Sequence, residues 1–516
     1  MFWADEIAAA IKQRASGKPQ HVDDMKTPSG KIHVGSLRGV LIHDLVHKAL
    51  LQLGIKSEYT YVFNDMDPMD GLPSYLDAAV YEPFMGYPLF KIPAPDGKSE
   101  SLARQYAQEF IDTIKILGAT PEIVWSHELY ESGGMNDLIR EVLDEASEIR
   151  SIYRDVAGYD RADNWYPFQV ICPKCGRVGT TVVDEWDGSQ VHFICQPDLV
   201  KWARGCGNEG KISPFNGNGK LMWKVDWPAH WKKLGITVEG AGKDHSSAGG
   251  SRDMAKAMCE RVFNYPHPYD IPYEWFLIGG KKMSSSKGVG TSAQEFSEIL
   301  PPSVARFLFT RSRFSKQMNF DPSGMTIPDL FDEYDRCANL FWKEGKENDQ
   351  ARAWEMAQIG DVPEEHFLPR FIDVAQYIQM PNIILNDKFT EIKGMPLTDL
   401  EMQELEIRST YARQWLDRYA PVDLKFMPAE TEKTEVKLTD KQVDYLHRLA
   451  ELLGDKEWEP ETLQNELYGL GKSMDLSSGE IFKAIYGRLI GKDHGPKAAW
   501  LILDLDRIFV LEQFRK

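Results

Sequence analysis

The sequence has no long hydrophobic run, no low-complexity tract and no internal repeat. A membrane-spanning helix needs about 20 mostly apolar residues, so we expect no membrane segment. Residues 1–17 have no apolar stretch followed by a cleavage site, which argues against a secretory signal. With 6 cysteines among 516 residues, the chain is not built on a disulfide framework. These absences predict a protein of a reducing compartment, the cytoplasm.

An excess of basic residues is also missing. The 60 basic residues are outnumbered by 78 acidic ones, which gives a net charge of −18 at pH 7. Such a chain is not a general binder of polyanions, so any nucleic acid must be bound by a local basic face. Hydrophobic residues make up 42% and charged residues 27%, as in folded globular proteins. The length predicts two to four domains.

The first part of the chain alternates between helical and strand patterns. Apolar residues recur at helical spacing over 36–53, 101–117 and 136–154, and aromatic and β-branched residues gather at 59–63. This alternation predicts an α/β fold with a doubly wound sheet of parallel strands. Residues 21–24 (HVDD) contain two acids and make a poor first strand.

The pattern changes over 165–219, where glycines, cysteines and short β-rich runs predominate. We interpret this segment as a small module inserted into the sheet. The α/β pattern then returns, with a strand at 236–238, a helix at 251–263 and a strand at 275–278. From about residue 291 onward the pattern is mostly helical.

A glycine-containing loop at 27–36 (TPSGKIHVGS) opens directly into a predicted helix. Backbone N–H groups at a helix start, together with the positive end of the helix dipole, favour a bound phosphate. Gly30 and Gly35 let the backbone approach a ligand closely, and His33 adds a donor. Taken alone, the loop is a weak signal, and an ordinary strand-to-helix turn is the more common explanation.

A second loop, at 279–288 (GGKKMSSSKG), follows a predicted strand. It carries three lysines and three serines between glycines. Point charges and small hydroxyl donors on a loop are typical of a clamp for phosphate. The order of the residues argues against a merely solvated basic loop.

Together the two loops resemble a known family. Residues 33–36 (HVGS) resemble the His-Ile-Gly-His signature of class I aminoacyl-tRNA synthetases, and 282–286 (KMSSS) resemble their Lys-Met-Ser-Lys-Ser signature. Three further runs are similar to class I lysyl-tRNA synthetases, the type common in archaea: 223–231 (WKVDWPAHW), 239–245 (EGAGKDH) and 249–251 (GGS). The resemblance implies a Rossmann-type catalytic domain split by the insertion, followed by an all-α C-terminal region.

The resemblance also implies an activity, the ATP-dependent ligation of L-lysine to tRNA(Lys) through a lysyl-adenylate. It implies catalytic roles for His33, Lys282, Ser284 and Ser285. It implies ATP contacts for Ser29, Gly30, His33, Gly35, Ser36, Gly242, Asp244, Lys282 and Met283. It implies lysine contacts for Thr27, Trp223, His245 and Tyr273. Mg²⁺ would accompany ATP, held mainly by phosphates and water.

The same resemblance suggests five parts of the chain. They are the first half of the catalytic domain (1–164), an inserted zinc-binding module (165–219), the second half with the KMSSS loop (220–290), a helical region contacting the tRNA stem (291–360) and a helical anticodon-binding domain (361–516). We expect a monomer, with tRNA and lysine as partners and no membrane.

A partner for the ε-ammonium group of lysine is suggested by 63–67 (FNDMD), at the carboxyl end of a predicted strand. Ligands of doubly wound sheets bind at that edge, and burying an unpaired ammonium is strongly unfavourable. Asp65 is therefore a candidate substrate-binding residue. The alternative is that these acids cap the following turn.

Four of the six cysteines lie in the inserted segment: Cys172, Cys175, Cys195 and Cys206. The first two have zinc-knuckle spacing, and four thiolates hold zinc tetrahedrally. A structural zinc replaces the core that so small a module cannot build. The second pair is widely spaced, so His192 is an alternative ligand and a metal-free ribbon an alternative state.

Other functions stay open at this point. Another class I synthetase is one alternative, but a glutamate enzyme would need a cationic side-chain partner and a cysteine enzyme usually an active-site zinc. An inactive paralogue that binds tRNA is a second. A nucleotidylyltransferase shares the first loop, but the length, the insert and the helical tail disfavour it.

Overall fold

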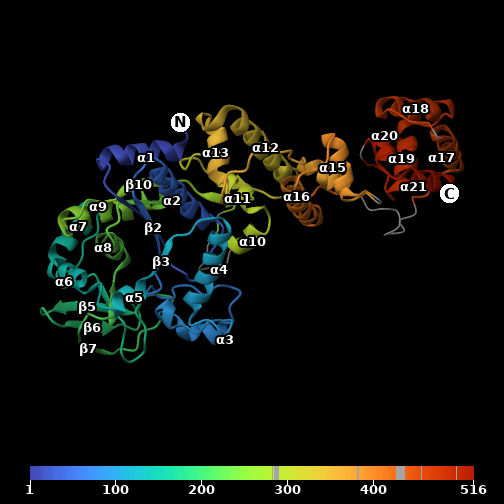
Figure 1. Cartoon of the computed structure of the whole chain (residues 1–516). Helices are drawn as coiled ribbons and strands as arrows, with labels where there is room; N and C mark the ends of the chain where they lie inside the picture. The colour runs from blue at the N-terminus through green and yellow to red at the C-terminus, as the bar shows by residue number, and fades with distance from the viewer. Residues whose placement is uncertain (282, 284–289, 381–382, 426–435, 455, 496) are drawn as a thin grey trace. The chain divides into compact units, whose positions relative to one another are not determined.

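The computed structural model describes residues 1–281, 283, 290–380, 383–425, 436–454, 456–495 and 497–516. The chain divides into two compact units (Figure 1). The first comprises Met1–Asp321 and Leu340–Val362, and the second Pro322–Asn339 and Pro363–Lys516. Among the described residues, no helix has both the length and the apolar character needed to cross a membrane.

The first unit is built on five strands in the order β10-β9-β1-β2-β3. Their bounds are β1 (Gln20–Lys26), β2 (Ser57–Phe63), β3 (Glu122–Trp125), β9 (Val238–Gly242) and β10 (Tyr269–Tyr273). All neighbouring strands of this sheet are parallel. Strand β1 is central, with β2 and β3 on one side and the much later β9 and β10 on the other. The expected doubly wound parallel sheet, split along the sequence, is therefore confirmed.

Strand β1 shows that the expectation of a poor strand at 21–24 was wrong. It pairs along its whole length with β2 and also pairs with β9. Asp23 is buried, and the Thr60 hydroxyl of β2 donates a 2.5 Å hydrogen bond to its carboxylate. Burial, followed by the charge of Glu239, raises the pKa of Asp23 well above its ordinary value. The acid is tolerated here because β2 supplies a donor to one carboxylate oxygen and burial favours the uncharged form, which the local pattern does not show.

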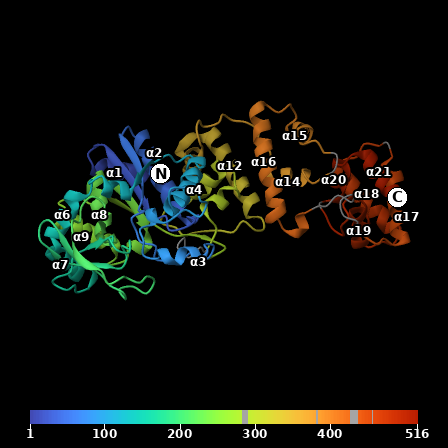
Figure 2. The ribbon, with the colours of Figure 1, turned by 90° about the horizontal axis from the view of Figure 1, so that it is seen from below.

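Helix α2 (Gly35–Gln52) packs on β1, β2 and β9, and α1 (Trp3–Arg14) packs against α2. The other helices described in this unit are α3 (Ala78–Tyr81), α4 (Leu102–Ile116), α5 (Ser126–Glu131), α6 (Asn136–Asp144), α7 (Ala146–Ala157), α8 (Trp223–Leu234), α9 (Ser251–Arg261), α10 (Ala293–Ser297), α11 (Pro302–Thr310) and α13 (Asp349–Ala357). Helices α6 to α9 lie side by side in both views (Figures 1 and 2).

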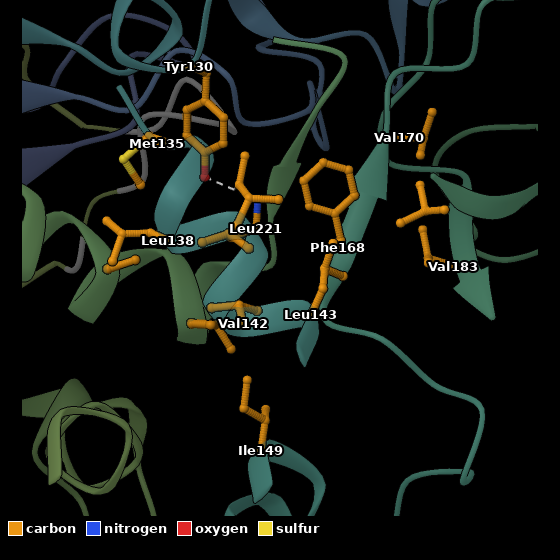
Figure 3. Packing of buried hydrophobic residues seen from close by; sticks show 14 of the residues in the cluster. Tyr130, Met135, Leu138, Val142, Leu143, Ile149, Phe168, Val170, Val183 and Leu221 are labelled. Carbon is orange, nitrogen blue, oxygen red and sulfur yellow. Dashed lines mark hydrogen bonds between the residues drawn. The ribbon is translucent and has the colours of Figure 1, made fainter. Parts of the chain in front are cut away.

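The single helix expected over 136–154 is two helices, α6 and α7, separated at Glu145. Because the chain turns there, Leu138 of α6 and Ile149 of α7 both reach one hydrophobic core (Figure 3). Leu221, which follows the inserted segment, joins this core as well. The break therefore serves packing that helical periodicity alone does not reveal.

Between α7 and α8 the chain forms two small antiparallel sheets. One pairs β4 (Phe168–Val170) with β8 (Gly219–Leu221), and the other has the order β5 (Thr181–Trp186), β6 (Val191–Cys195), β7 (Glu209–Ile212). Residues from β4, β5, β6 and β8 join the core that also holds α6 and α7.

Two strands differ in detail from the sequence-based expectation. The strand expected at 236–238 begins only at Val238 and runs to Gly242. The strand expected at 275–278 is β11 (Phe276–Ile278), and it pairs with β12 (Met318–Phe320) outside the five-stranded sheet.

The second unit is helical. It contains the first part of α12 (Thr326–Glu344) together with α14 (Phe371–Tyr377), α15 (Leu385–Lys393), α16 (Asp399–Arg418), α17 (Asp440–Leu453), α18 (Pro460–Ser473), α19 (Ser478–Leu489), α20 (Ala498–Asp504) and α21 (Arg507–Arg515). Leu446, Leu467 and Ile485 of α17, α18 and α19 are buried in one core of this unit. The mostly helical pattern expected beyond residue 291 is thus confirmed.

Candidate active site

A cavity of about 390 Å³ opens at the carboxyl ends of β1, β9 and β10. Strands β1 and β9 are neighbours at the point where the strand order reverses, which is where doubly wound sheets bind ligands. Ten of the residues proposed from the sequence line this cavity: Thr27, Ser29, His33, Gly35, Ser36, Gly242, Asp244, His245, Tyr273 and Met283. The fold thus gathers distant segments of the chain at one site.

The loop at 27–36 forms one wall and leads into α2. The first turn of α2 carries no acidic side chain and no side-chain cap, so its positive end favours an anion. Burial lowers the pKa of His33 to about 3, which keeps the imidazole neutral near pH 7. A Cβ at Gly35 would lie 2.9 Å from the His33 ring, so only glycine leaves room for the ring in this position.

Thr27 is fixed by a chain of buried polar contacts. Its hydroxyl donates a 2.6 Å hydrogen bond to Asp67. Asp67 forms an ion pair with Lys220 of β8, and the Lys220 ammonium also lies 3.2 Å from Asp226. The Tyr130 hydroxyl donates a 2.5 Å hydrogen bond to Asp226. These linked contacts connect β8, at the boundary of the inserted segment, to the cavity wall.

An aromatic group supports the opposite wall. Trp223 does not line the cavity; it stacks on Trp227, with ring centroids 5.3 Å apart, and its edge meets the ring of His245. His245 does line the cavity. Trp227 and Trp231 both donate their indole N–H groups to the buried Glu239. Burial raises the pKa of Glu239 to about 7.

Like Trp223, two other described residues proposed as ligand contacts, Gly30 and Asp65, are not part of the cavity lining. The Asp65 carboxylate is buried and accepts hydrogen bonds from the backbone N–H and the Nδ1 of His127, at 2.9 and 2.5 Å. Asp65 does lie just after β2, at the carboxyl edge of the sheet, as expected. Its carboxylate oxygens, however, are hydrogen-bonded to His127.

Three residues proposed as catalytic, Lys282, Ser284 and Ser285, lie outside the described residues. Met283 is described and lines the cavity. It lies against the start of α2, since a Cβ at Gly35 would be 3.4 Å from its Cε.

Four charged residues line the cavity that the sequence analysis missed: Asp24, Lys26, Arg38 and Glu274. Asp24 and Lys26 belong to β1. From the sequence alone, this segment is expected to be a poor strand because it contains two acids. Had β1 been recognised, both would have been placed at the carboxyl end of a parallel strand. Position at the carboxyl end of a predicted strand was also the feature that made Asp65 a candidate.

The four cysteines of the inserted segment lie together. Their sulfur atoms are all within 4.8 Å of one another, and the Sγ atoms of Cys172 and Cys206, and of Cys175 and Cys195, are 3.7 Å apart. Four convergent thiols are a donor set that can bind a metal ion. His192 is not part of this group, and its Nδ1 lies 2.7 Å from the carboxylate of Asp184.

Comparisons with known proteins show which family this chain resembles. The model of the family described as tRNA synthetases class I (K) matches residues 1–360. The lysine–tRNA ligase of Archaeoglobus fulgidus is 32% identical over 100% of this chain and 99% of its own length. That of Methanosphaera stadtmanae is 30% identical over 99% of both chains. A solved glutamate tRNA ligase from Elizabethkingia meningosepticum is similar over 96% of this chain and 98% of its own, with 12% identity and a TM-score of 0.42.

The family match covers more than half of the chain, and the relatives match it from end to end. The two loops that carry the class I signatures belong to the same unit, and His33, Gly35 and Ser36 of the first and Met283 of the second line the cavity. The chain belongs to the family of class I (K) tRNA synthetases.

Proposed function

We propose that this chain is a lysine–tRNA ligase, which joins L-lysine to tRNA(Lys) with cleavage of ATP to AMP and pyrophosphate. The observation that carries the proposal is the end-to-end match to relatives named lysine–tRNA ligase. The cavity at the switch point of the sheet supports it, because its charged lining includes three carboxylates beside Lys26 and Arg38, and lysine is a cationic substrate. A glutamate enzyme would instead need a cationic partner for the substrate side chain. The relatives named lysine–tRNA ligase do not favour another class I synthetase or an inactive paralogue.

The reaction has two steps. The lysine carboxylate attacks the α-phosphorus of ATP, and pyrophosphate leaves as the lysyl-adenylate forms. The terminal ribose hydroxyl of tRNA then attacks the acyl carbon of the adenylate, loses its proton, and releases AMP. Neither step needs a covalent enzyme intermediate, so catalysis rests on positioning and on stabilising negative charge.

The chain's own residues supply these effects. In this proposal His33, Gly35 and Ser36 meet the ATP phosphates at the start of α2, and Lys282 with Ser284 and Ser285 neutralises the leaving pyrophosphate. Ser29, Gly30, Gly242, Asp244 and Met283 contact ATP. Thr27, His245 and Tyr273 contact lysine, while Trp223 supports His245. Mg²⁺ accompanies ATP, bound mainly by phosphate oxygens.

The remaining parts of the proposal concern tRNA and assembly. We assign the catalytic domain to 1–164 and 220–290, a zinc-binding module to 165–219, a region contacting the tRNA stem to 291–360 and an anticodon-binding domain to 361–516. We propose a monomer that acts in the cytoplasm.

Amino-acid-dependent exchange of pyrophosphate into ATP tests the function. We expect exchange with L-lysine among the twenty amino acids, measured with and without total tRNA. A requirement for tRNA would show that the site is completed by the nucleic acid. Exchange with glutamate or cysteine instead would refute the lysine assignment, and binding of tRNA without any exchange would favour an inactive paralogue.

Zinc is the metal that we propose for the four-cysteine group. The donor set fits, because thiolates suit zinc and the sulfur atoms already converge. Purified protein is expected to contain about one zinc per chain by atomic emission, and Cys175→Ser should lower that content substantially. Cys337→Ser is the matched control, since this buried cysteine lies outside the group. Equal metal content in all three proteins would contradict the site.

A further inference from the structure

The acids along the cavity differ in how free they are to bind a cationic ligand. Three of them line it: Asp24, Asp244 and Glu274. Glu274 forms a 2.6 Å ion pair with Lys243. Asp244 is exposed, where water weakens any charge–charge interaction. Asp24 is 7% exposed, so its charge acts in a less polar environment and discriminates more strongly between ligands.

Two neighbouring groups hold the carboxylate of Asp24 in place. Its Oδ1 accepts a 2.8 Å hydrogen bond from the backbone N–H of Met25. Its Oδ2 lies 3.6 Å from the Nδ1 of His43. The Nε2 of His43 accepts the N–H of Gly240 at 2.7 Å, which leaves the ring proton on Nδ1, 2.7 Å from the Gly39 carbonyl. Burial alone would lower the pKa of His43, but the charge of Asp24 raises it instead. His43 is thus held between Gly240, Gly39 and the carboxylate of Asp24.

Gly39 explains how two polar groups converge on one point. Its φ is not positive, so the helix backbone does not require glycine, and glycine inside a helix is less favourable than alanine. A Cβ there would lie 2.7 Å from Asp24 Oδ2 and 2.8 Å from the hydroxyl of Tyr273. The carboxylate and the phenol thus occupy the space that a side chain would take.

The position of this point suits the length of lysine. Gly39 lies one turn of α2, about 6 Å, beyond Gly35 at the phosphate end of the cavity. A lysine whose carboxylate lies near Gly35 extends its four-carbon stem over a similar distance. Lys26, on the same wall as Asp24, supplies a positive charge for the other end of a zwitterion. Burial lowers the pKa of Lys26, and the charges of Asp24 and Asp244 oppose that change.

We propose that Asp24, together with the hydroxyl of Tyr273, binds the ε-ammonium group of the substrate lysine. This inference rests on the proposed function and replaces Asp65 as the partner of the ammonium. Gly39 is the positioning residue that leaves room for both groups. An acid at this point also disfavours glutamate, which would bring a second carboxylate to it.

The test compares L-lysine with L-norleucine, which lacks only the ε-ammonium group. We expect Asp24→Asn to lower kcat/KM for lysine in ATP–pyrophosphate exchange by roughly 10- to 100-fold, as for a hydrogen bond to a charged group. The value for norleucine should change less than about 3-fold, and KM for ATP should not change. Tyr273→Phe should show the same selectivity for lysine at a smaller size.

Asp112→Asn is the matched control, because Asp112 is exposed on α4 and bonded to Gln108. It should leave both substrates unaffected. Thermal unfolding of each variant separates loss of lysine recognition from loss of folding. If Asp24→Asn does not fold, Tyr273→Phe still tests the proposal, because it removes only one oxygen atom.

The outcomes are distinct. An equal loss with lysine and norleucine would overturn the proposal, since Asp24 would then act on the α-amino group or on the fold. An unchanged preference for lysine in both variants would also overturn it while leaving the proposed function intact. Absence of lysine-dependent exchange in the unaltered protein would refute the proposed function, and this inference with it.

Discussion

Replacing Lys220 with methionine is expected to lower the free energy of unfolding by about 3–5 kcal/mol. The Lys220 ammonium is 1% exposed and pairs with Asp67 and with the equally buried Asp226. Methionine keeps most of the volume but removes the cation from two carboxylates, the fully buried Asp226 and the partly buried Asp67. Urea unfolding followed by tryptophan fluorescence measures the change. Because Asp67 also holds Thr27, lysine binding should weaken as well.

Lys211→Met is the matched control. Lys211 also pairs with two carboxylates, Glu185 and Asp187, but its side chain is 42% exposed. Ion pairs of this kind contribute about 0–1 kcal/mol. If the Lys220 variant is as stable as the Lys211 variant, the prediction is wrong, and water must reach Lys220 and its two carboxylates.

The effect of Lys220→Met should depend on pH. Burial alone would raise the pKa of Asp226, but Lys220 and then His230 hold it well below its ordinary value. Burial alone would lower the pKa of Lys220, but Asp67 and Asp226 raise it instead. The stabilisation is therefore present between the ordinary values, about pH 4 and pH 10, and is lost as the pH falls or rises through the shifted ones. The difference from the unaltered protein should shrink below about pH 4.

Replacing His33 with alanine is expected to lower the rate of lysyl-adenylate formation about 10²- to 10³-fold. The neutral ring lies over the first turn of α2 on the cavity wall, where it can donate to a phosphate oxygen as charge develops. Such a donor acts mainly on kcat, so KM for lysine should change little. Lysine-dependent pyrophosphate exchange measures both constants. Lys282→Ala is expected to produce a loss of the same order.

The control for His33 is His47→Ala, on the same helix but bonded to Ser57 and absent from the cavity lining. It should keep nearly full activity. Because burial lowers the pKa of His33 to about 3, His33 should contribute no change in rate between pH 5 and 8. A His33 variant within about 5-fold of the unaltered protein would contradict its assigned role.

Local patterns were sufficient for several features. The alternation of helices and strands predicted the α/β sheet, and the glycine-containing loop predicted the start of α2 on the cavity wall. Cysteine spacing identified four residues whose sulfur atoms do converge. These features depend on neighbours in sequence, such as backbone periodicity, glycine positions and the short Cys-x-x-Cys turn, so the sequence alone carries them.

Tertiary structure decided which charged side chains line the cavity and which are paired with other groups of the protein. Asp65 and Asp24 both stand at the ends of parallel strands, yet His127 engages Asp65 while Asp24 lines the cavity. The acids of β1 and the buried Lys220 are stable because their partners come from other elements. A buried charge is fixed by the groups that surround it in space. The sequence by itself therefore determined the fold class, the family and the loop proposed to bind phosphate, and only the tertiary structure decided the side chain proposed to bind the ammonium of lysine.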